Sequence, residues 1–245
     1  MGRQRLQVEN YNYAGEQARL GVPTSAAGDN QLEIHRIRVR NSTGSAGLLG
    51  ACIKLSSANY ELYAAETGNA DLNAIKDGTT TSIVDNDNND GFIVESPDKF
   101  NLIGFDVTQA DGGGATYAFQ YWNGSSWTAL TGIQLGVSFS ATGSEVMLCP
   151  TQLDWAQATS VSGSGASVYA LRVIATTAGV AVVQANDLWV GRLIEFSEGV
   201  ADNAFIEVEF SSGEPLLLKG GESIMPVFAS ANNDNSVSVH YKFNE

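Results

Sequence analysis

The stretch that decides the fold is "AFIEVEFSSGEPLLLKGGESIMPVFASANNDNSVSVHYKF" (Ala204–Phe243), close to the end of the chain. Runs of β-branched and aromatic residues alternate here with turn sequences such as "KGGE" and "ASANNDNS", which predicts three or four antiparallel strands. Between Ser236 and Tyr241 polar and apolar residues alternate, so one face of the sheet is apolar. Such a sheet cannot bury this face alone, and the strands expected around residues 32–63 are its natural partner.

The rest of the chain repeats this pattern, with strand-like segments about every 8–12 residues and turn residues between them. The segment "QLEIHRIRVRN" (Gln31–Asn41) alternates apolar and polar residues, with one slip in phase at His35–Arg36. The alternation predicts a half-buried strand, and the slip indicates a β-bulge. Because helical periodicity is scarce throughout, we predict an all-β fold of antiparallel, jelly-roll-like β-sandwiches.

The order of the expected strands suggests two sandwich domains, one inserted into the other. The first and last strands would share one sandwich, formed by residues 31–96 and 189–245. Residues 97–188 would form the inserted sandwich, and residues 1–30 an extended N-terminal arm. The start lacks the apolar core of a signal peptide, and no stretch approaches the ~20 apolar residues of a membrane span, so we expect no membrane contact.

Charge separates the beginning of the chain from the remainder. Residues 1–40 hold six bases and four acids, a balance of +2, whereas the other 205 residues hold seven bases and 23 acids, a balance of −16. An acidic body disfavours nucleic-acid binding, because phosphate contacts need Lys and Arg. The basic start is interpreted either as a solvated segment or as a surface that docks on an acidic partner. The candidate docking residues are Arg3, Arg5, Arg19, Arg36, Arg38 and Arg40.

The motif "FQYWNGSSWTAL" (Phe119–Leu130) concentrates aromatic residues around an Asn-Gly turn. Asn-Gly between two alternating runs predicts a β-hairpin. Tyr121 and Trp122 point to opposite faces of its first strand, so both are candidates for stacking on a ligand. Packing in the core or across the strands accounts for aromatic pairs in a hairpin without any ligand, and we expect this role for most of them.

Three segments of the middle, "YAFQYWNGSSWTAL", "GSEVMLCPTQLDW" and "VYALRV", together resemble a β-sandwich module of tailed-phage virion proteins. The resemblance implies that Asn123–Gly124 make the turn and that Trp127 and Trp155 pack the core or a corner. It also implies that Arg172 lies against Trp155 or pairs with Asp154. The residues that carry it are Tyr121, Trp122, Asn123, Gly124, Trp127, Pro150, Asp154, Trp155, Tyr169 and Arg172.

The tip "DNDNNDG" (Asp85–Gly91) is a candidate for calcium binding, because hard cations prefer clustered carboxylate and amide oxygens. An EF-hand is excluded, since the closing acid of that motif would fall on Pro97. A looser site using Asp85, Asp87 and Asp90 stays open beside the simpler interpretation, a polar hairpin tip. We expect no cofactor.

The sequence contains no recognisable catalytic set. His35 and His240 are the two histidines, each on an expected strand, and no G-x-S-x-G motif is present. The two carboxylates of "FIEVEF" share a strand face, which we interpret as a solvated surface rather than a glycosidase pair. Cys52 and Cys149 lie far apart, and we expect both to be free, buried thiols.

We therefore expect a non-enzymatic virion structural protein that decorates or cements the capsid surface of a tailed phage, with the major capsid protein as its partner. The resemblance implies a homo-oligomer, often a trimer, that is made in the host cytoplasm and ends on the capsid surface. The alternative is a glycan- or host-surface-binding module of a phage tail or fibre. In that case the exposed ring of Trp122 or Tyr121 would stack on sugar rings.

Overall fold

The computed structural model describes residues 7–12, 20–21, 32–41, 47–66, 68–133, 137–211, 214–228 and 236–243. These residues form antiparallel β-strands and two short 3₁₀ helices, η1 (Ser57–Asn59) and η2 (Asn73–Asp77), and contain no α-helix. The prediction of an all-β, antiparallel fold is confirmed. In the described part of the chain, no helix is long and apolar enough to cross a membrane.

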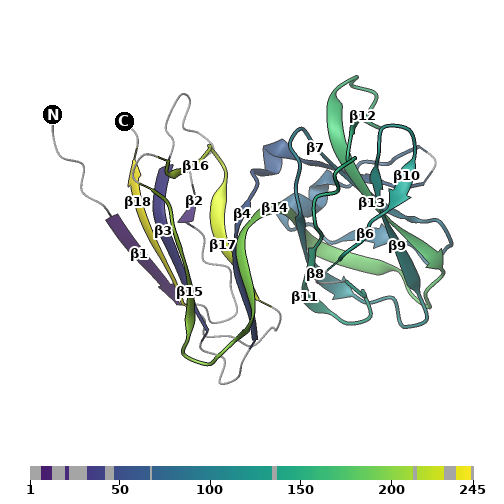
Figure 1. The fold of residues 1–245 in the computed structure, drawn as a ribbon. Coiled ribbons are helices and arrows are strands. Elements are labelled where there is room, and N and C mark those ends of the chain that lie inside the picture. The colour runs from purple at the N-terminus through teal and green to yellow at the C-terminus, as the bar shows by residue number, and fades with distance from the viewer. Residues whose placement is uncertain are drawn as a thin grey trace. The chain divides into compact units, whose positions relative to one another are not determined.

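The chain divides into two compact units (Figure 1): a terminal unit of Met1–Ser56 and Arg192–Glu245, and a middle unit of Ser57–Gly191. The expected strand order predicts an inserted part that begins at residue 97, but in the structure the middle unit begins at residue 57. The difference arises from strand pairing. β5 (Glu61–Ala64) pairs with β7 (Gly91–Ser96), and β7 pairs with β13 (Ser167–Thr177), so both early strands belong to the middle unit.

Two sheets build the terminal unit, and they form two layers in Figure 1. The first contains β1 (Gln7–Asn12), β18 (Ser236–Phe243), β3 (Leu32–Arg40), β15 (Phe205–Glu209) and β16 (Leu216–Leu218). The second contains the latter part of β14 (Val183–Val200), β4 (Gly47–Lys54), β17 (Ser223–Phe228) and β2 (Leu20–Gly21). The apolar residues of β3 predicted to face the core, such as Ile34 and Val39, are completely buried.

The strands of Ala204–Phe243 do not form a sheet of their own, which corrects the first expectation. β15, β16 and β18 all pair with β3, whereas β17 pairs with β4 in the other sheet. Strands from the beginning and from the end of the chain therefore share both sheets of this unit, instead of each end forming a sheet of its own. Alternation fixes which face of a strand is buried, but it does not choose the neighbour in the sheet.

The expected N-terminal arm is partly built into these sheets. β1 pairs with β18 over six residues, and β2 pairs with β17. Both described segments of residues 1–30 are therefore strands at sheet edges. Arg3, Arg5 and Arg19 lie outside the described residues.

The bulge predicted in β3 is confirmed. His240 of β18 pairs with Arg36, but the next residue, Tyr241, pairs with Ile34, so His35 is the extra residue. The insertion explains the phase slip in the sequence, because it lets both Ile34 and Ile37 reach the core from a strand whose side chains otherwise alternate.

The middle unit also contains two sheets. The first holds β10 (Trp127–Ala129), β9 (Thr116–Trp122), β13, β7, β5 and β12 (Gln157–Thr159). The second holds β11 (Gly143–Leu148), β8 (Leu102–Gln109), the first part of β14 and β6 (Thr81–Val84). Phe92 on β7 meets Phe105 on β8 edge to face, with ring centroids 5.6 Å apart, and Phe139 contacts both rings. These aromatic contacts join the two sheets in one core.

A close approach in the second sheet requires a glycine. Gly104 on β8 lies opposite Trp189 on β14, and a Cβ atom at this position would be 2.0 Å from the indole ring. Only a residue without a side chain leaves room for the indole ring against the neighbouring strand.

Candidate functional site

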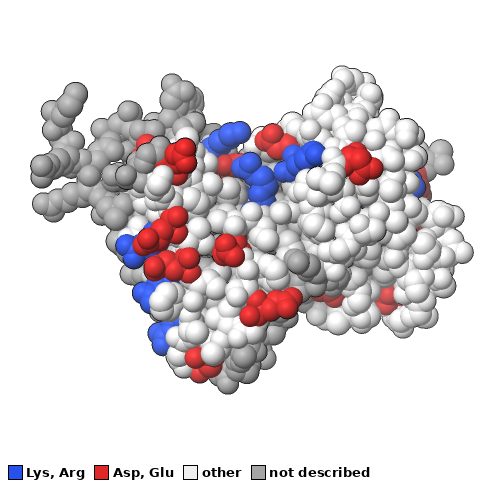
Figure 2. Space-filling model, in the orientation of Figure 1, with Lys and Arg blue, Asp and Glu red and all other residues white. Residues whose placement is uncertain are grey.

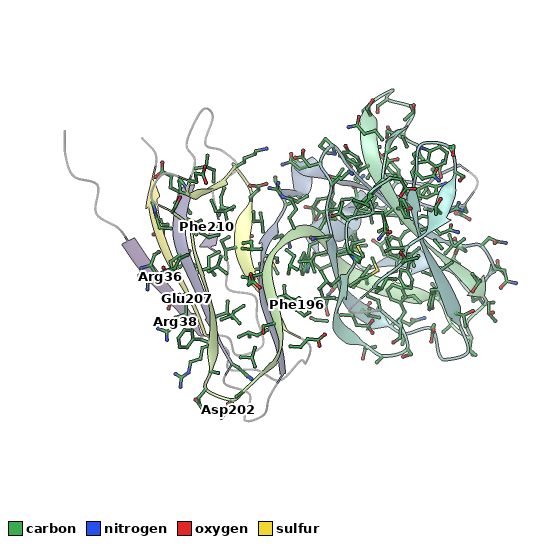
Figure 3. All side chains as sticks on the ribbon, in the orientation of Figure 1. Arg36, Arg38, Phe196, Asp202, Glu207 and Phe210 are labelled. Atoms are coloured by element: carbon green, nitrogen blue, oxygen red, sulfur yellow. The ribbon has the colours of Figure 1, made fainter. Side chains whose placement is uncertain are left out.

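Two outer sheet faces carry four of the residues predicted to act in binding: Arg36, Arg38 and Arg40 on one, and Trp122 on the other. The first lies on the terminal unit, where β3 and β15 run side by side. Figure 3 shows Arg36, Arg38 and Glu207 on the outer side of this sheet, and Figure 2 shows basic and acidic side chains next to one another along it. We call this surface the arginine face.

The acids of β15 partly neutralise the arginine face. Arg36 lies 3.7 Å from a Glu207 oxygen and 3.5 Å from a Glu209 oxygen. Arg38 lies 3.9 Å from the same Glu207 carboxylate. The paired carboxylates of "FIEVEF" therefore bind arginines across the strands, and Arg36 has two acidic partners.

Arg38 and Arg40 have different neighbours. The Arg38 guanidinium lies 3.5 Å from the centre of the Phe205 ring, which is 46% exposed. Arg40 donates a hydrogen bond of 2.7 Å to Oδ1 of Asn203, a neutral side chain. Together with Ser238 of β18, these four residues line a hollow of about 300 Å³, which we call the arginine hollow.

The turn between β14 and β15 positions Asn203. This residue has a left-handed backbone, with φ of 63°, and its N–H donates to the carbonyl of Asn41. Its side-chain amide also donates to Asp202, at 2.6 Å. With its backbone and its amide both held, Asn203 presents Oδ1 to Arg40.

The two histidines lie on the same sheet. Burial and the nearby Arg36 charge lower the pKa of His240, and Glu207 opposes this shift. His35 Nε2 lies 3.6 Å from a Glu33 oxygen, too far for a good hydrogen bond. Neither histidine is placed beside a nucleophile by any contact among the described residues.

The second outer face belongs to the hairpin of β9 and β10 in the middle unit. Trp122 pairs with Trp127 across the hairpin, and the loop between them contains Asn123 and Gly124, as predicted. Asn123 Oδ1 accepts hydrogen bonds from the backbone of Ser125 and Ser126, and Gly124 has a φ of 100°. These features fix the loop without help from a ligand.

Tyr121 faces the core and does not present its ring to solvent. It is 4% exposed, its hydroxyl donates to Asp154 at 2.7 Å, and its ring meets Trp155 edge to face. Of the two stacking candidates, only Trp122 is therefore left. Trp155 also contacts Phe100 and Tyr169, so the core role implied for Trp155 agrees with its contacts.

Trp122 and Trp127 lie on the outer face of the sheet, with ring centroids 5.7 Å apart and planes at 74°. Arg172 on β13 lies 4.6 Å from the centre of the Trp127 ring, and its Nε donates to Gln120 Oε1 at 2.6 Å. We call this group the tryptophan face. It corrects the expectation that Arg172 lies against Trp155 or pairs with Asp154.

Trp127 and Gln120 belong to this face but were not among the predicted binding residues. The signal was present, because a four-residue turn at Asn123–Ser126 makes Trp122 and Trp127 direct cross-strand partners. Cross-strand partners point to the same side of a sheet. Arg172 could not be placed in this way, because its distance in sequence hides its pairing with Gln120.

The calcium candidates line a second hollow of about 400 Å³, together with Glu66 and the asparagines of the loop. One of its carboxylates is engaged within the loop, since Asp90 accepts hydrogen bonds from the backbone of Asp85 and of Gly91. Burial raises the pKa of Asp85, and the charges of Asp90 and Asp87 raise it further. Among the described residues, no three His, Cys, Asp or Glu side chains are placed to hold a metal ion.

The loop around these acids is also not a hairpin tip. β6 pairs with β14, whereas β7 pairs with β13 and β5 in the other sheet. The loop therefore connects two sheets, which periodicity alone does not distinguish from a hairpin.

Cys52 and Cys149 are free, buried thiols, as predicted. Burial raises the pKa of each to about 12. Because the thiolate is the reactive form, both side chains behave as small apolar core residues at neutral pH.

No protein-family model, curated protein or solved structure matches this chain. The function is therefore inferred from the residues of the chain itself.

Proposed function

We propose that this chain is a non-enzymatic virion structural protein that decorates or cements the capsid of a tailed phage. The observation that carries the proposal is the arginine hollow on the terminal unit, where Arg38 and Arg40 meet Asn203, Phe205 and Ser238. The proposed partner is an acidic segment of the major capsid protein.

The hollow suits carboxylates for reasons of geometry and charge. A guanidinium group offers parallel N–H donors that match the two oxygens of a carboxylate. Arg40 is held by the neutral Asn203, and the nearest Glu207 oxygen lies 3.9 Å from Arg38. An incoming carboxylate would therefore replace weak or neutral partners. Arg36 contributes less, because Glu207 and Glu209 already neutralise it.

The middle unit supports the same proposal through its charge and its motifs. Residues 57–191 contain three bases and 14 acids, a net charge of −11. Such a unit resists non-specific association with nucleic acid and other anionic surfaces. The residues that resemble a phage virion module meet in this unit at the hairpin and around Trp155.

Binding to an assembled lattice would stabilise that lattice by mass action, because the protein binds the assembled state and not the free subunits. The proposed location is the outer surface of the capsid, reached after synthesis in the host cytoplasm. The resemblance also favours a homo-oligomer, such as a trimer around a local symmetry axis.

The test is co-sedimentation of the purified full-length chain with empty expanded capsids of the source phage. Truncating the first 30 residues is unsuitable, because it would remove β1 from its sheet. We expect saturable binding that weakens at least about tenfold in R38E and in R40E. K219E, which makes the same charge change on an exposed base of the same unit, should bind normally. Equal binding by all four proteins would exclude the arginine hollow as the docking site, and no binding by any would remove the decoration proposal.

A further inference from the structure

The tryptophan face carries a second, independent inference. Its residues follow two rows across neighbouring strands. Trp127 and Trp122 lie opposite each other in one row, and Gln120 and Arg172 lie opposite each other in the next. Side chains two residues apart on a strand point to the same side, so Trp122 and Gln120 share this face. Two indoles, a guanidinium and a carboxamide therefore meet on one sheet surface.

Arg172 lacks an acidic partner among the described residues, although the unit around it has a net charge of −11. One N–H of its guanidinium binds Gln120, and the Trp127 ring lies against its plane. For comparison, Lys76 in the same unit donates to two backbone carbonyls and also pairs with the carboxylate of Glu61. In the described part of the chain, no carboxylate accepts from the remaining N–H groups of Arg172.

The face is also held in place before any ligand arrives. Asn123 fixes the hairpin loop, and the carbonyl of Trp122 accepts a hydrogen bond from the backbone of Ala156. Beneath the sheet, Tyr121 is locked by Asp154 and Trp155. A rigid platform lowers the entropic cost of binding, because few side chains must become ordered.

We propose that the tryptophan face binds a neutral saccharide, with a pyranose ring against the indole of Trp122 and its hydroxyl groups bonded to Arg172 and Gln120. The C–H groups on one face of a pyranose are apolar and carry a small positive charge, which suits the negative face of an aromatic ring. Guanidinium N–H groups donate to hydroxyl oxygens, and the carboxamide of Gln120 both donates and accepts.

The charge of the unit selects among saccharides. A net charge of −11 repels sialic and uronic acids as they approach, even though Arg172 itself is a cation. Neutral hexoses and N-acetylhexosamines carry no such penalty. The inference does not rest on capsid decoration, since it uses another unit and another surface.

The test begins with the full-length chain on a printed array. The array carries linear oligosaccharides of glucose, galactose, mannose and N-acetylglucosamine, with sialylated and uronic acid oligosaccharides on the same slide. We expect binding to neutral oligosaccharides, followed by calorimetric titration with the oligosaccharide that binds best. W122A and R172Q should each weaken binding at least about tenfold. W122F, which keeps an aromatic face, should bind more tightly than W122A.

Val180 provides the control, because it is an apolar residue of the same unit that is 77% exposed and lies outside this face. V180A should bind as the original chain does. Near-UV circular dichroism checks that W122A keeps its tertiary structure. Three results would overturn the proposal: no binding to any neutral oligosaccharide, binding confined to the acidic ones, or equal affinity of W122A and the original chain.

Discussion

Arg36 and Arg172 occupy equivalent places in the two units, since each lies on the outer face of a sheet between two neighbouring strands. Arg36 has carboxylates at 3.5 and 3.7 Å from the adjacent strand. Arg172 has a carboxamide at 2.6 Å and an indole ring at 4.6 Å. The same residue type is neutralised by acids in one unit, whereas in the other it has no acidic partner among the residues that the structure describes.

The difference shows that the residues on the adjacent strands decide whether the charge of an arginine on a sheet surface is neutralised. On the terminal unit, β15 supplies Glu207 and Glu209, and the resulting ion pairs are exposed to water. Exposed pairs contribute about 0–1 kcal/mol to stability. On the middle unit, β9 supplies Gln120 and β10 supplies Trp127. There Arg172 packs against an aromatic surface, and burial lowers the pKa of its guanidinium.

The largest expected effect on stability comes from truncating the aromatic core of the middle unit. Phe92 is completely buried and contacts Phe105 and Phe139. We expect F92A to lower the free energy of unfolding by about 3–5 kcal/mol, because it leaves a cavity between the sheets. All four tryptophans lie in the middle unit, so their fluorescence reports urea unfolding of that unit.

The control for this prediction is I37A, which truncates a buried aliphatic residue of the terminal unit. Circular dichroism at the peptide band follows both units together. We expect F92A to lower the urea midpoint of the fluorescence transition at least as far as I37A does. A fluorescence midpoint that moved more in I37A than in F92A would contradict the placement of the aromatic core.

Replacing Arg172 or Arg36 by Met removes the guanidinium group but keeps an apolar stem, so the two variants measure what each guanidinium contributes to stability. R172M should cost about 1–2 kcal/mol, because it removes a cation–π contact and leaves Gln120 without its partner. R36M should cost about 0–1 kcal/mol, since it removes exposed ion pairs only. Urea midpoints at low and high salt measure both effects. The R36M effect should shrink at high salt, whereas that of R172M should persist.

The smallest expected effect concerns His240, beside Arg36. Its pKa in the folded protein lies below the ordinary 6.5, so the unfolded chain binds the proton more tightly. Stability is therefore full above about pH 6.5 and falls as the pH decreases below it. H240Q should reduce this loss between pH 6.5 and 5, as measured by urea unfolding at each pH. R36M should raise the pKa of His240 in an NMR titration, and an unchanged pKa would show that Arg36 does not act on it.

Local rules predicted the features that depend on neighbours in sequence. The phase slip located the bulge at His35, and Asn123–Gly124 located the hairpin turn. Period-two alternation predicts which face of a strand turns inward, and the apolar positions that it selects, such as Ile37, are buried. The free state of Cys52 and Cys149 followed from their number and spacing.

Pairing between distant strands could not be predicted in this way. Residues 57–96 joined the middle unit because β5 and β7 pair with one another and β7 with β13. Periodicity carries no information on which distant strand offers the better neighbour. For the same reason the local pattern predicts one sheet for the strands of Ala204–Phe243, although β17 pairs with β4 in the other sheet.

Local sequence patterns predict the antiparallel strands, the hairpin turn at Asn123–Gly124, the bulge at His35, and which residues are apolar enough to be buried. These properties follow from backbone preferences and from contacts within a few residues. Tertiary structure alone decided that Arg36 meets two carboxylates while Arg172 meets an indole, and that Arg38 and Arg40 line one hollow. The charges next to a side chain and its exposure depend on which strands are paired in the sheet, and these strands are far apart in the chain.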